Sequence, residues 1–201
     1  MRFGAILSAA VAGALSSGAF AQGVSYKAPT VDPLAVRIMD SYAQCAVVRD
    51  PDRAARLLAA DYRTDAYRRA IRDFAMSNRK CLHGGKLAFS QLIFAGDMAE
   101  AVLRREHVSV EQIAQEAASD QAPGAARCIV QKRPRDVAAL LATKPTSDEE
   151  HDAITGLGNT LIACTPRGRT AITNTVGLRA ELALATYHLT HDQTPEASGN
   201  R

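Results

Sequence analysis

The sequence predicts an all-α protein of two tandem four-helix repeats packed into one compact helical unit, each repeat with its own internal disulfide. Three observations lead to this prediction. The 201 residues are rich in alanine, leucine and arginine, and only 5% are aromatic, a composition that favours helices. Residues 45–81 align without a gap on residues 128–164. Each of the two aligned segments begins and ends with a cysteine.

The first 21 residues have the pattern of a cleavable export signal. Arg2 is followed by a run of small and apolar residues over positions 4–15, and Ala19-Phe20-Ala21 precedes Gln22 as a small-residue cleavage site. The run is short and rich in alanine, glycine and serine, whereas a spanning helix needs about 20 strongly apolar residues. We therefore favour a signal peptide over an uncleaved anchor. The mature protein is expected to be periplasmic or secreted, with no transmembrane segment after signal removal.

Internal self-similarity divides the rest of the chain. At an offset of 83 residues, 11 of 37 aligned positions are identical, among them both cysteines and Pro51/Pro134. The match continues at the same offset over 85–90 and 168–173, and after a two-residue shift, at an offset of 81, Gly96 aligns with Gly177. Such a duplication determines the architecture before any local pattern does. We expect an N-terminal arm over 22–31, repeat 1 over 32–106, a connector over 107–122, repeat 2 over 123–191 and a disordered tail over 192–201.

The duplication also bears on how the four cysteines pair. In an oxidising compartment an even number of cysteines indicates disulfides, and four cysteines allow three pairings. An ancestral single copy had two cysteines, which most simply pair with each other. We therefore expect Cys45–Cys81 and Cys128–Cys164. Pairing between the copies is the alternative.

The first two helices of a repeat are marked by Asp-Pro pairs. Asp32 provides a cap and Pro33 the first helical position, and the following apolar residues recur at helical spacing. Asp50 and Pro51 restart the chain in the same way, which predicts a short second helix. Repeat 2 keeps the proline but has Arg133 in place of the aspartate.

The third and fourth helices follow on either side of a glycine break. The third is expected to begin near Thr64 in repeat 1, or within the cluster 146–150 in repeat 2, and to end at the second cysteine. A short extended piece over 87–89 or 170–172 comes next. Ser90 or Thr173 then caps a fourth helix, which runs to about Arg105 or His188. Ser109-x-x-Gln112 in the connector is compatible with an extra helix.

Charged residues that recur in both repeats are the candidate ligand-binding residues, because the core explains recurring apolar ones. Four such pairs recur: Arg49/Lys132, Asp65/Asp148, Lys86/Arg169 and Glu100/Glu181. Asp65 and Asp148 are interpreted as helix N-terminal residues, and Lys86/Arg169 and Glu100/Glu181 are the candidates for ligand binding. Each glutamate lies inside an otherwise apolar helix, so the two carboxylates are expected either to contact a ligand or to form a paired site at a symmetry axis. The favoured alternative is structural: an ion pair with Lys86 or Arg169, or an acid in the first turns of the fourth helix.

Motifs for catalysis or metal binding are weak. His188 and His191 are one helical turn apart, but a zinc site needs a third protein ligand, and no H-E-x-x-H or G-x-S-x-G pattern is present. We favour a role for both histidines at a helix C-terminus. His83, His107 and His151 are interpreted as unrepeated histidines in separate segments. The sequence thus assigns no catalytic residue, no metal ligand and no cofactor.

Charge excludes one class of partner and suggests another. A net charge of +3 is too small to indicate nucleic acid, and export removes the protein from it. Between Cys45 and Lys86, however, ten residues are basic and five acidic. The clusters Arg53/Arg56 and Arg68/Arg69/Arg72 form either a basic face for an anionic envelope component or, as we favour, a solvated helix surface.

One family resemblance is carried by the starts of the two aligned cysteine segments. These are Cys45-Ala-Val-x-Arg-x-Pro51 and Cys128-Ile-Val-x-Lys-x-Pro134. With the alanine-rich signal and the cysteine spacing, they resemble uncharacterised small exported proteins of sphingomonad-type bacteria. This resemblance implies location and a helical disulfide fold, and no activity. Our leading hypothesis is a non-enzymatic module that binds a protein or an envelope component. A small hydrolase or metal-dependent enzyme, and an envelope-surface protein with a basic face, are the alternatives.

Overall fold

The computed structural model describes residues 32–62, 64–82, 90–119, 124–166 and 174–191. This part of the chain consists of helices and turns, without a strand, so the predicted all-α class is confirmed. The elements are α1 (Pro33–Arg49), α2 (Pro51–Leu58), α3 (Asp65–Ser77), the 3-10 helix η1 (Arg79–Cys81), α4 (Gln91–Arg105), α5 (Val110–Ser119), α6 (Ala125–Lys132), α7 (Pro134–Ala142), α8 (Asp148–Gly156), α9 (Gly158–Cys164) and α10 (Thr175–His191). The predicted signal, arm, extended pieces and tail lie outside the described residues.

Polar side chains cap α1, α3 and α8 where the sequence predicts helix starts, whereas Asp50 and Ser90, also expected as caps, make no side-chain cap hydrogen bond. The Asp32 carboxylate caps α1. At α3 the Thr64 hydroxyl accepts the backbone N–H of Tyr67 at 3.1 Å, and at α8 the Ser147 hydroxyl accepts that of Glu150 at 3.2 Å. Thr64 and Ser147 are 83 residues apart, so equivalent positions of the aligned segments carry equivalent caps. Such a cap contributes about 1 kcal/mol.

The helices α2 and α7 begin at the two aligned prolines. The residue before each proline has nearly the same backbone conformation, with φ −141° and ψ 66° at Asp50 and φ −138° and ψ 53° at Arg133. Steric contact with the proline ring keeps the preceding residue out of the helical region. The proline therefore fixes this corner, which explains why Arg133 replaces the aspartate without altering the turn. These correspondences agree with the predicted duplication.

Both expected disulfides are present. Cys45 on α1 is joined to Cys81 in η1, and Cys128 on α6 is joined to Cys164 at the end of α9. In each half of the chain the bond therefore connects the end of the first helical segment to the end of the third. The prediction of pairing within each copy is confirmed.

The connector (107–122) and the second half (residues 123–191) each depart once from a plain four-helix plan. The connector forms the extra helix α5, whose start is capped by the Ser109 hydroxyl and whose Ile113 is buried. The third helix is divided into α8 and α9 at Leu157, which lies between Gly156 and Gly158. Glycine lowers helix propensity by about 1 kcal/mol relative to alanine, which explains why the break falls there.

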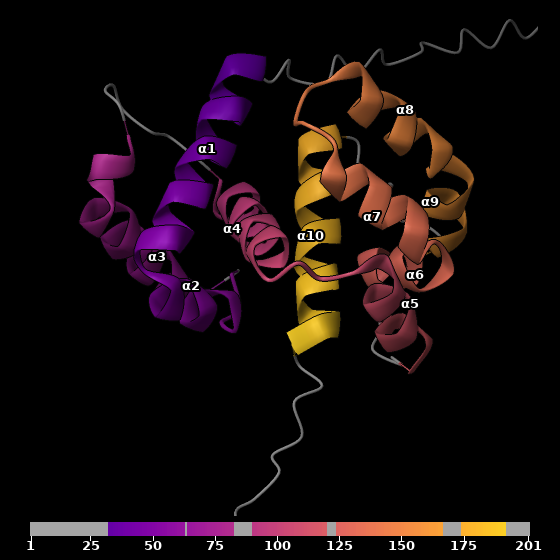
Figure 1. Ribbon diagram of the computed structural model, residues 1–201, viewed down its shortest axis with the longest axis horizontal. Coiled ribbons are helices and arrows are strands. Elements are labelled where there is room, and N and C mark those ends of the chain that lie inside the picture. Colours follow the sequence, from indigo (N-terminus) through magenta and orange to yellow (C-terminus); the bar gives the residue numbers. More distant parts are fainter. Residues whose placement is uncertain (1–31, 63, 83–89, 120–123, 167–173, 192–201) are drawn as a thin grey trace, which may run out of the picture.

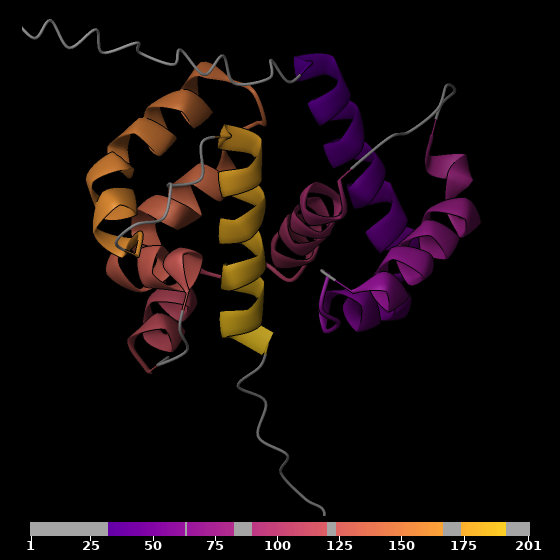
Figure 2. The same cartoon turned by 180° about the vertical axis from the view of Figure 1, so that it is seen from behind.

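Two central helices join the halves. Figures 1 and 2 show α4 and α10 crossing in the middle of the molecule, with α1–α3 on one side and α5–α9 on the other. The packing of α10 against α4 is the most extensive of all the helix pairs. Phe94 and Met98 of α4 and Leu182 of α10 are fully buried, and all three belong to one core cluster with residues of both halves. The hydrophobic core is therefore shared by the two halves.

A glycine allows α4 and α10 to approach closely. A methyl group placed on Gly96 would lie 2.4 Å from both the Cα and the Cβ of Ala180, and 2.9 Å from its carbonyl oxygen. Two of these three atoms belong to the backbone, so a rotamer change cannot relieve the clash.

Gly96→Ala is therefore expected to lower the free energy of unfolding by about 2–3 kcal/mol, the upper part of the range for overpacked cores. The matched control is Gly156→Ala, because an added methyl there meets no atom within 4 Å. That control is expected to stabilise the protein by about 0.5–1 kcal/mol through helix propensity. Urea denaturation of both variants measures the difference. Equal effects of the two substitutions would contradict the close packing of α4 on α10.

Candidate functional site

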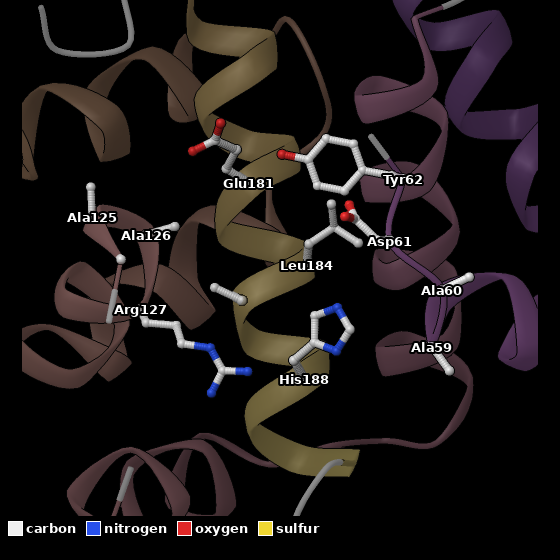
Figure 3. Close-up of a pocket in the computed structure, with 12 residues that line it drawn as sticks. Ala59, Ala60, Asp61, Tyr62, Ala125, Ala126, Arg127, Glu181, Leu184 and His188 are labelled. Carbon is white, nitrogen blue, oxygen red and sulfur yellow. The ribbon is translucent and has the colours of Figure 1, made fainter. Parts of the chain in front are cut away.

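A groove of about 420 Å³ lies between the two halves. One wall is the corner that follows α2, residues 59–62; the other is the start of α6, residues 124–127; and α10 forms the floor. Figure 3 shows ionisable side chains from all three segments around it. They are Asp61, Tyr62, Arg127, Glu181 and His188. The volume of this cleft lies within the range of small-ligand sites.

The floor follows one face of α10. Glu181, Leu184, Ala185 and His188 are spaced three or four residues apart, so they lie on the same side of the helix. Leu184 and Ala185 are buried, whereas Glu181 and His188 are half-buried. An acid and an imidazole thus stand two turns apart with an apolar strip between them.

The aligned face of α4 has a different role. At the offset of 81 residues, Glu100 aligns with Glu181 and His107 aligns with His188. His107 therefore has a counterpart in the second half, contrary to the interpretation of it as unrepeated. His107 lies beyond the end of α4 and has a φ of 53°, which turns the chain away from the helix. The helix α10 continues through His188 and forms the groove floor instead.

Glu100 lies in a buried cluster of charged residues. Its carboxylate is only 2% exposed and accepts two hydrogen bonds from Arg179, at 2.7 Å from Nε and 2.8 Å from Nη2. Arg104, on the same helix, donates to the same carboxylate at 2.5 Å and to Asp40 of α1 at 3.2 Å. Arg179 also donates to Glu150 of α8 at 3.0 Å. We call these five residues the ion-pair cluster.

Arg179 also donates hydrogen bonds to the C-terminal end of α7. Its Nη1 donates to the carbonyl of Leu140 and to the Thr143 hydroxyl, and its Nη2 donates to the carbonyls of Leu141 and Thr143. Burial alone would lower the pKa of Arg179, but its hydrogen bonds to Glu100 and the charges of Glu100 and Glu150 outweigh burial and raise it. The guanidinium therefore stays charged and fastens α10 to three other helices.

Asp97 adjoins this cluster without sharing in its hydrogen bonds. It lies one turn before Glu100 on α4 and is 6% exposed, and its Oδ2 atom has no hydrogen-bond partner among the described residues. Burial raises the pKa of Asp97 well above its ordinary value of 3.8. The nearby charges of Glu100 and Asp40 raise it further, while Arg179 and Arg104 oppose them. The carboxyl group is therefore favoured in its neutral form.

Asp97→Asn is expected to remove a loss of stability that the wild type shows as the pH rises. The folded state binds the Asp97 proton more tightly than the unfolded chain does. The free energy of unfolding therefore falls with rising pH from the ordinary value of 3.8 up to the raised pKa. Asparagine cannot ionise, so its advantage over the wild type grows across this window. Urea denaturation at a series of pH values measures it, with the exposed Asp152→Asn as control. A constant difference between Asp97→Asn and the wild type would contradict the raised pKa.

The structure places the recurring candidate residues in different surroundings. Glu100 is enclosed by Arg179 and Arg104, whereas Glu181 lines the groove. Lys86 and Arg169 lie outside the described residues, so their expected ion pairs with the glutamates stay predictions. Glu100 has a structural role, but its partners are Arg104 and Arg179, and it lies beyond the first two turns of α4 rather than at its start.

The two C-terminal histidines are also separated in role. His191 contacts the carboxylate of Glu106 at 2.8 Å and stacks on Tyr187, with 4.0 Å between ring centroids. His188 lines the groove. Among the described residues, no three or more His, Cys, Asp or Glu side chains are grouped so that they could hold a metal ion.

The basic residues of the first half lie on α2 and α3. Arg56, Arg69 and Arg72 are exposed. Arg53, in contrast, donates to the Ser77 hydroxyl at 3.0 Å and lies over the ring of Phe74. Part of the predicted basic face therefore stabilises the fold.

A serine–lysine spacing that the sequence reasoning overlooked occurs in the same region. Ser77 and Lys80 have the S-x-x-K spacing of some serine nucleophiles. The Ser77 hydroxyl, however, donates to the carbonyl of Asp73 at 2.8 Å and accepts from Arg53. These contacts give Ser77 a structural role at the end of α3.

A second hollow, of about 450 Å³, is formed by one face of α1 and the segment around the first disulfide. Leu34 and Ile38 are exposed at its edge, although both are large apolar residues. Among the described residues of its lining, Arg37 is the only charged one. We prefer the groove as the candidate site because its ionisable groups come from both halves.

Three comparisons, with protein-family models, with curated proteins and with solved structures, find no match to this chain. In the part of the chain that the structure describes, none of the helices combines the length and the apolar character needed to cross a membrane. Two disulfides are typical of proteins that fold in an oxidising compartment.

Proposed function

We propose that this chain is an exported, non-enzymatic binding module of the periplasm or the extracellular space, and that its ligand site is the groove. The observation that carries this proposal is the composition of the groove: acidic, basic and apolar side chains from both halves surround one open cleft. The ligand is a protein segment or another envelope component. The signal-like residues 1–21 support export, and the disulfides support an oxidising destination.

Rigid surroundings support binding at this place. The floor helix α10 is fixed to α4 and α8 through Arg179, and the Cys128–Cys164 disulfide fastens α6, which bears one wall, to α9. A preformed cleft loses little conformational entropy when a ligand enters, so more of the contact energy appears as affinity. The cluster and this disulfide thereby hold the groove ready for its ligand.

The experiment maps where ligands from the envelope contact the protein. Amide chemical shifts of labelled mature protein are recorded with fractionated envelope extract. A bulky side chain at the exposed wall residue Ala60, introduced as Ala60→Trp, blocks the groove. The matched control is Ala55→Trp, at an exposed alanine of α2 that does not line the groove.

We expect shift changes at groove residues in the wild type and in the Ala55→Trp control, and their loss in Ala60→Trp. Changes confined to Arg56, Arg69 and Arg72 would instead favour the basic face. Stoichiometric zinc in purified protein, lost in His188→Ala, would favour the metal-dependent enzyme. No change with any fraction, or equal changes in both tryptophan variants, would contradict the proposal.

A further inference from the structure

The chemistry of the groove narrows its ligand beyond the proposed function on which this inference rests. We infer that the groove binds a short linear peptide, about three residues long, with small apolar side chains, a cationic amino end and a free carboxylate. The features that support this ligand are the separation of charge along the groove, its length and the size of the residues between its charged ends.

Opposite charges are placed at opposite ends of the groove. Figure 3 shows Glu181, Asp61 and the Tyr62 hydroxyl toward one end, and Arg127 and His188 toward the other. Arginine and histidine are donors that suit a carboxylate, while two carboxylates beside a phenol suit an ammonium group. A ligand with one charge at each end therefore matches this arrangement better than a ligand with a single charge.

The distance between these ends fits a tripeptide. Glu181 and His188 are seven residues apart on α10, which corresponds to about 10 Å along the helix axis. An extended chain spans at most about 3.5 Å per residue, so three residues cover a similar length between their charged ends. Longer peptides would extend past one of the two charged ends, and a single amino acid could not reach both.

The residues between the charged ends are small or apolar. Leu184 and Ala185 form the floor, and the walls contribute alanines at 59, 60, 125 and 126. Methyl-sized walls leave space for a peptide backbone beside the floor helix, and the small total volume of the groove leaves little for large side chains. The groove volume of about 420 Å³ is also within the lower part of the range for small-ligand sites. The inferred ligand therefore has alanine-like side chains.

The test uses trialanine and its capped forms, measured by isothermal titration calorimetry with the full mature chain. Trialanine carries both terminal charges, N-acetyl-trialanine only the carboxylate, and trialanine amide only the ammonium group. We expect saturable 1:1 binding of trialanine, and at least tenfold weaker binding of each capped form. The caps change the ligand alone, so this part of the test does not depend on whether any variant folds.

Two protein variants assign the orientation of the peptide. Glu181→Gln is expected to weaken the binding of trialanine tenfold. It is expected to leave the binding of N-acetyl-trialanine unchanged, because the acetyl group has already removed the charge that Glu181 meets. Arg127→Gln is expected to weaken the binding of trialanine tenfold and to leave the binding of trialanine amide unchanged, because the amide has already removed the charge that Arg127 meets. Glu111→Gln and Arg135→Gln, at exposed positions outside the groove, are the matched controls.

Three outcomes would overturn the inference: no saturable binding of trialanine, equal binding of the free and capped peptides, or equal effects of the groove variants and their controls. These outcomes are distinguishable from failure of the proposed function. If envelope fractions shift groove amides while trialanine does not bind, the binding module stands and the peptide class is wrong. If neither affects the groove, both are wrong.

Discussion

Arg179→Met is expected to destabilise the protein by about 3–5 kcal/mol, the range for removing one partner of a buried ion pair. The side chain of Arg179 is 4% exposed and pairs with Glu100 and Glu150, which are 2% and 7% exposed. The substitution leaves the Glu150 carboxylate without its arginine in a place that water scarcely reaches. It also removes the donor for the last carbonyls of α7. Methionine is chosen because the aligned position in the first half is Met98.

Urea denaturation measures this loss, with the exposed Arg135→Met as a control for removing a guanidinium. Adding Glu150→Gln to Arg179→Met is expected to recover part of the stability, because the unpaired charge disappears. In the wild-type background the same Glu150→Gln change is expected to be destabilising. A loss below about 1 kcal/mol for Arg179→Met would show that the cluster does not support the fold, since exposed pairs contribute about that much.

Removing either disulfide is expected to cost about 4 kcal/mol. The cysteines of each pair are 36 residues apart in sequence, and a closed loop of this length has that effect in the chain-entropy treatment. The paired variants are Cys45→Ala with Cys81→Ala, and Cys128→Ala with Cys164→Ala. The free energy of unfolding of a small domain is about 5–15 kcal/mol in total. Loss of both disulfides is therefore expected to leave the chain unfolded at 37 °C.

Denaturation of the two paired variants, compared with the oxidised wild type, measures these losses. Equal losses are expected because the two loops have equal length. Peptide mapping under non-reducing conditions checks the pairing itself. A peptide that joins Cys45 to Cys128 or to Cys164 would show that the bonds connect the halves, and the stability argument for each loop would then fail.

The features that could be predicted from the sequence are those that depend on nearby residues or on spacing. The caps at Thr64 and Ser147 and the corners at Pro51 and Pro134 follow from local backbone geometry. The disulfides follow from equal cysteine spacing and one argument about duplication. The division of the third helix near Leu157 was not expected, although the two flanking glycines are its visible cause.

The ion-pair cluster was missed because candidate residues were chosen by their recurrence in both halves. Arg179 aligns with Met98, and Glu150 aligns with Tyr67, so neither recurs. The second half has a charged pair at the positions where the first half has two buried side chains, the apolar Met98 and the aromatic Tyr67. A usable signal was present nonetheless: a lone arginine inside the apolar stretch of α10 requires a buried acidic partner.

Only part of the groove could be predicted from the sequence. Glu181 was a candidate through its recurrence, and His188 was considered for metal binding. The acid and phenol at 61 and 62 and the arginine at 127 come from segments far apart in the chain. They meet because α10 packs against both α6 and α4, and α4 in turn packs against α2. No periodicity in a single segment reports such a meeting.

The ion-pair cluster also determines whether the halves are separable. Glu100 belongs to the first half, while Arg179 and Glu150 belong to the second. A fragment that contained only residues 32–106 would keep the Glu100 carboxylate but lack its partner, the Arg179 guanidinium. A fragment of residues 123–191 would carry the converse defect. If the chain arose by duplication, its copies have since become mutually dependent, so the present protein is no longer a modular array and should unfold as one cooperative unit.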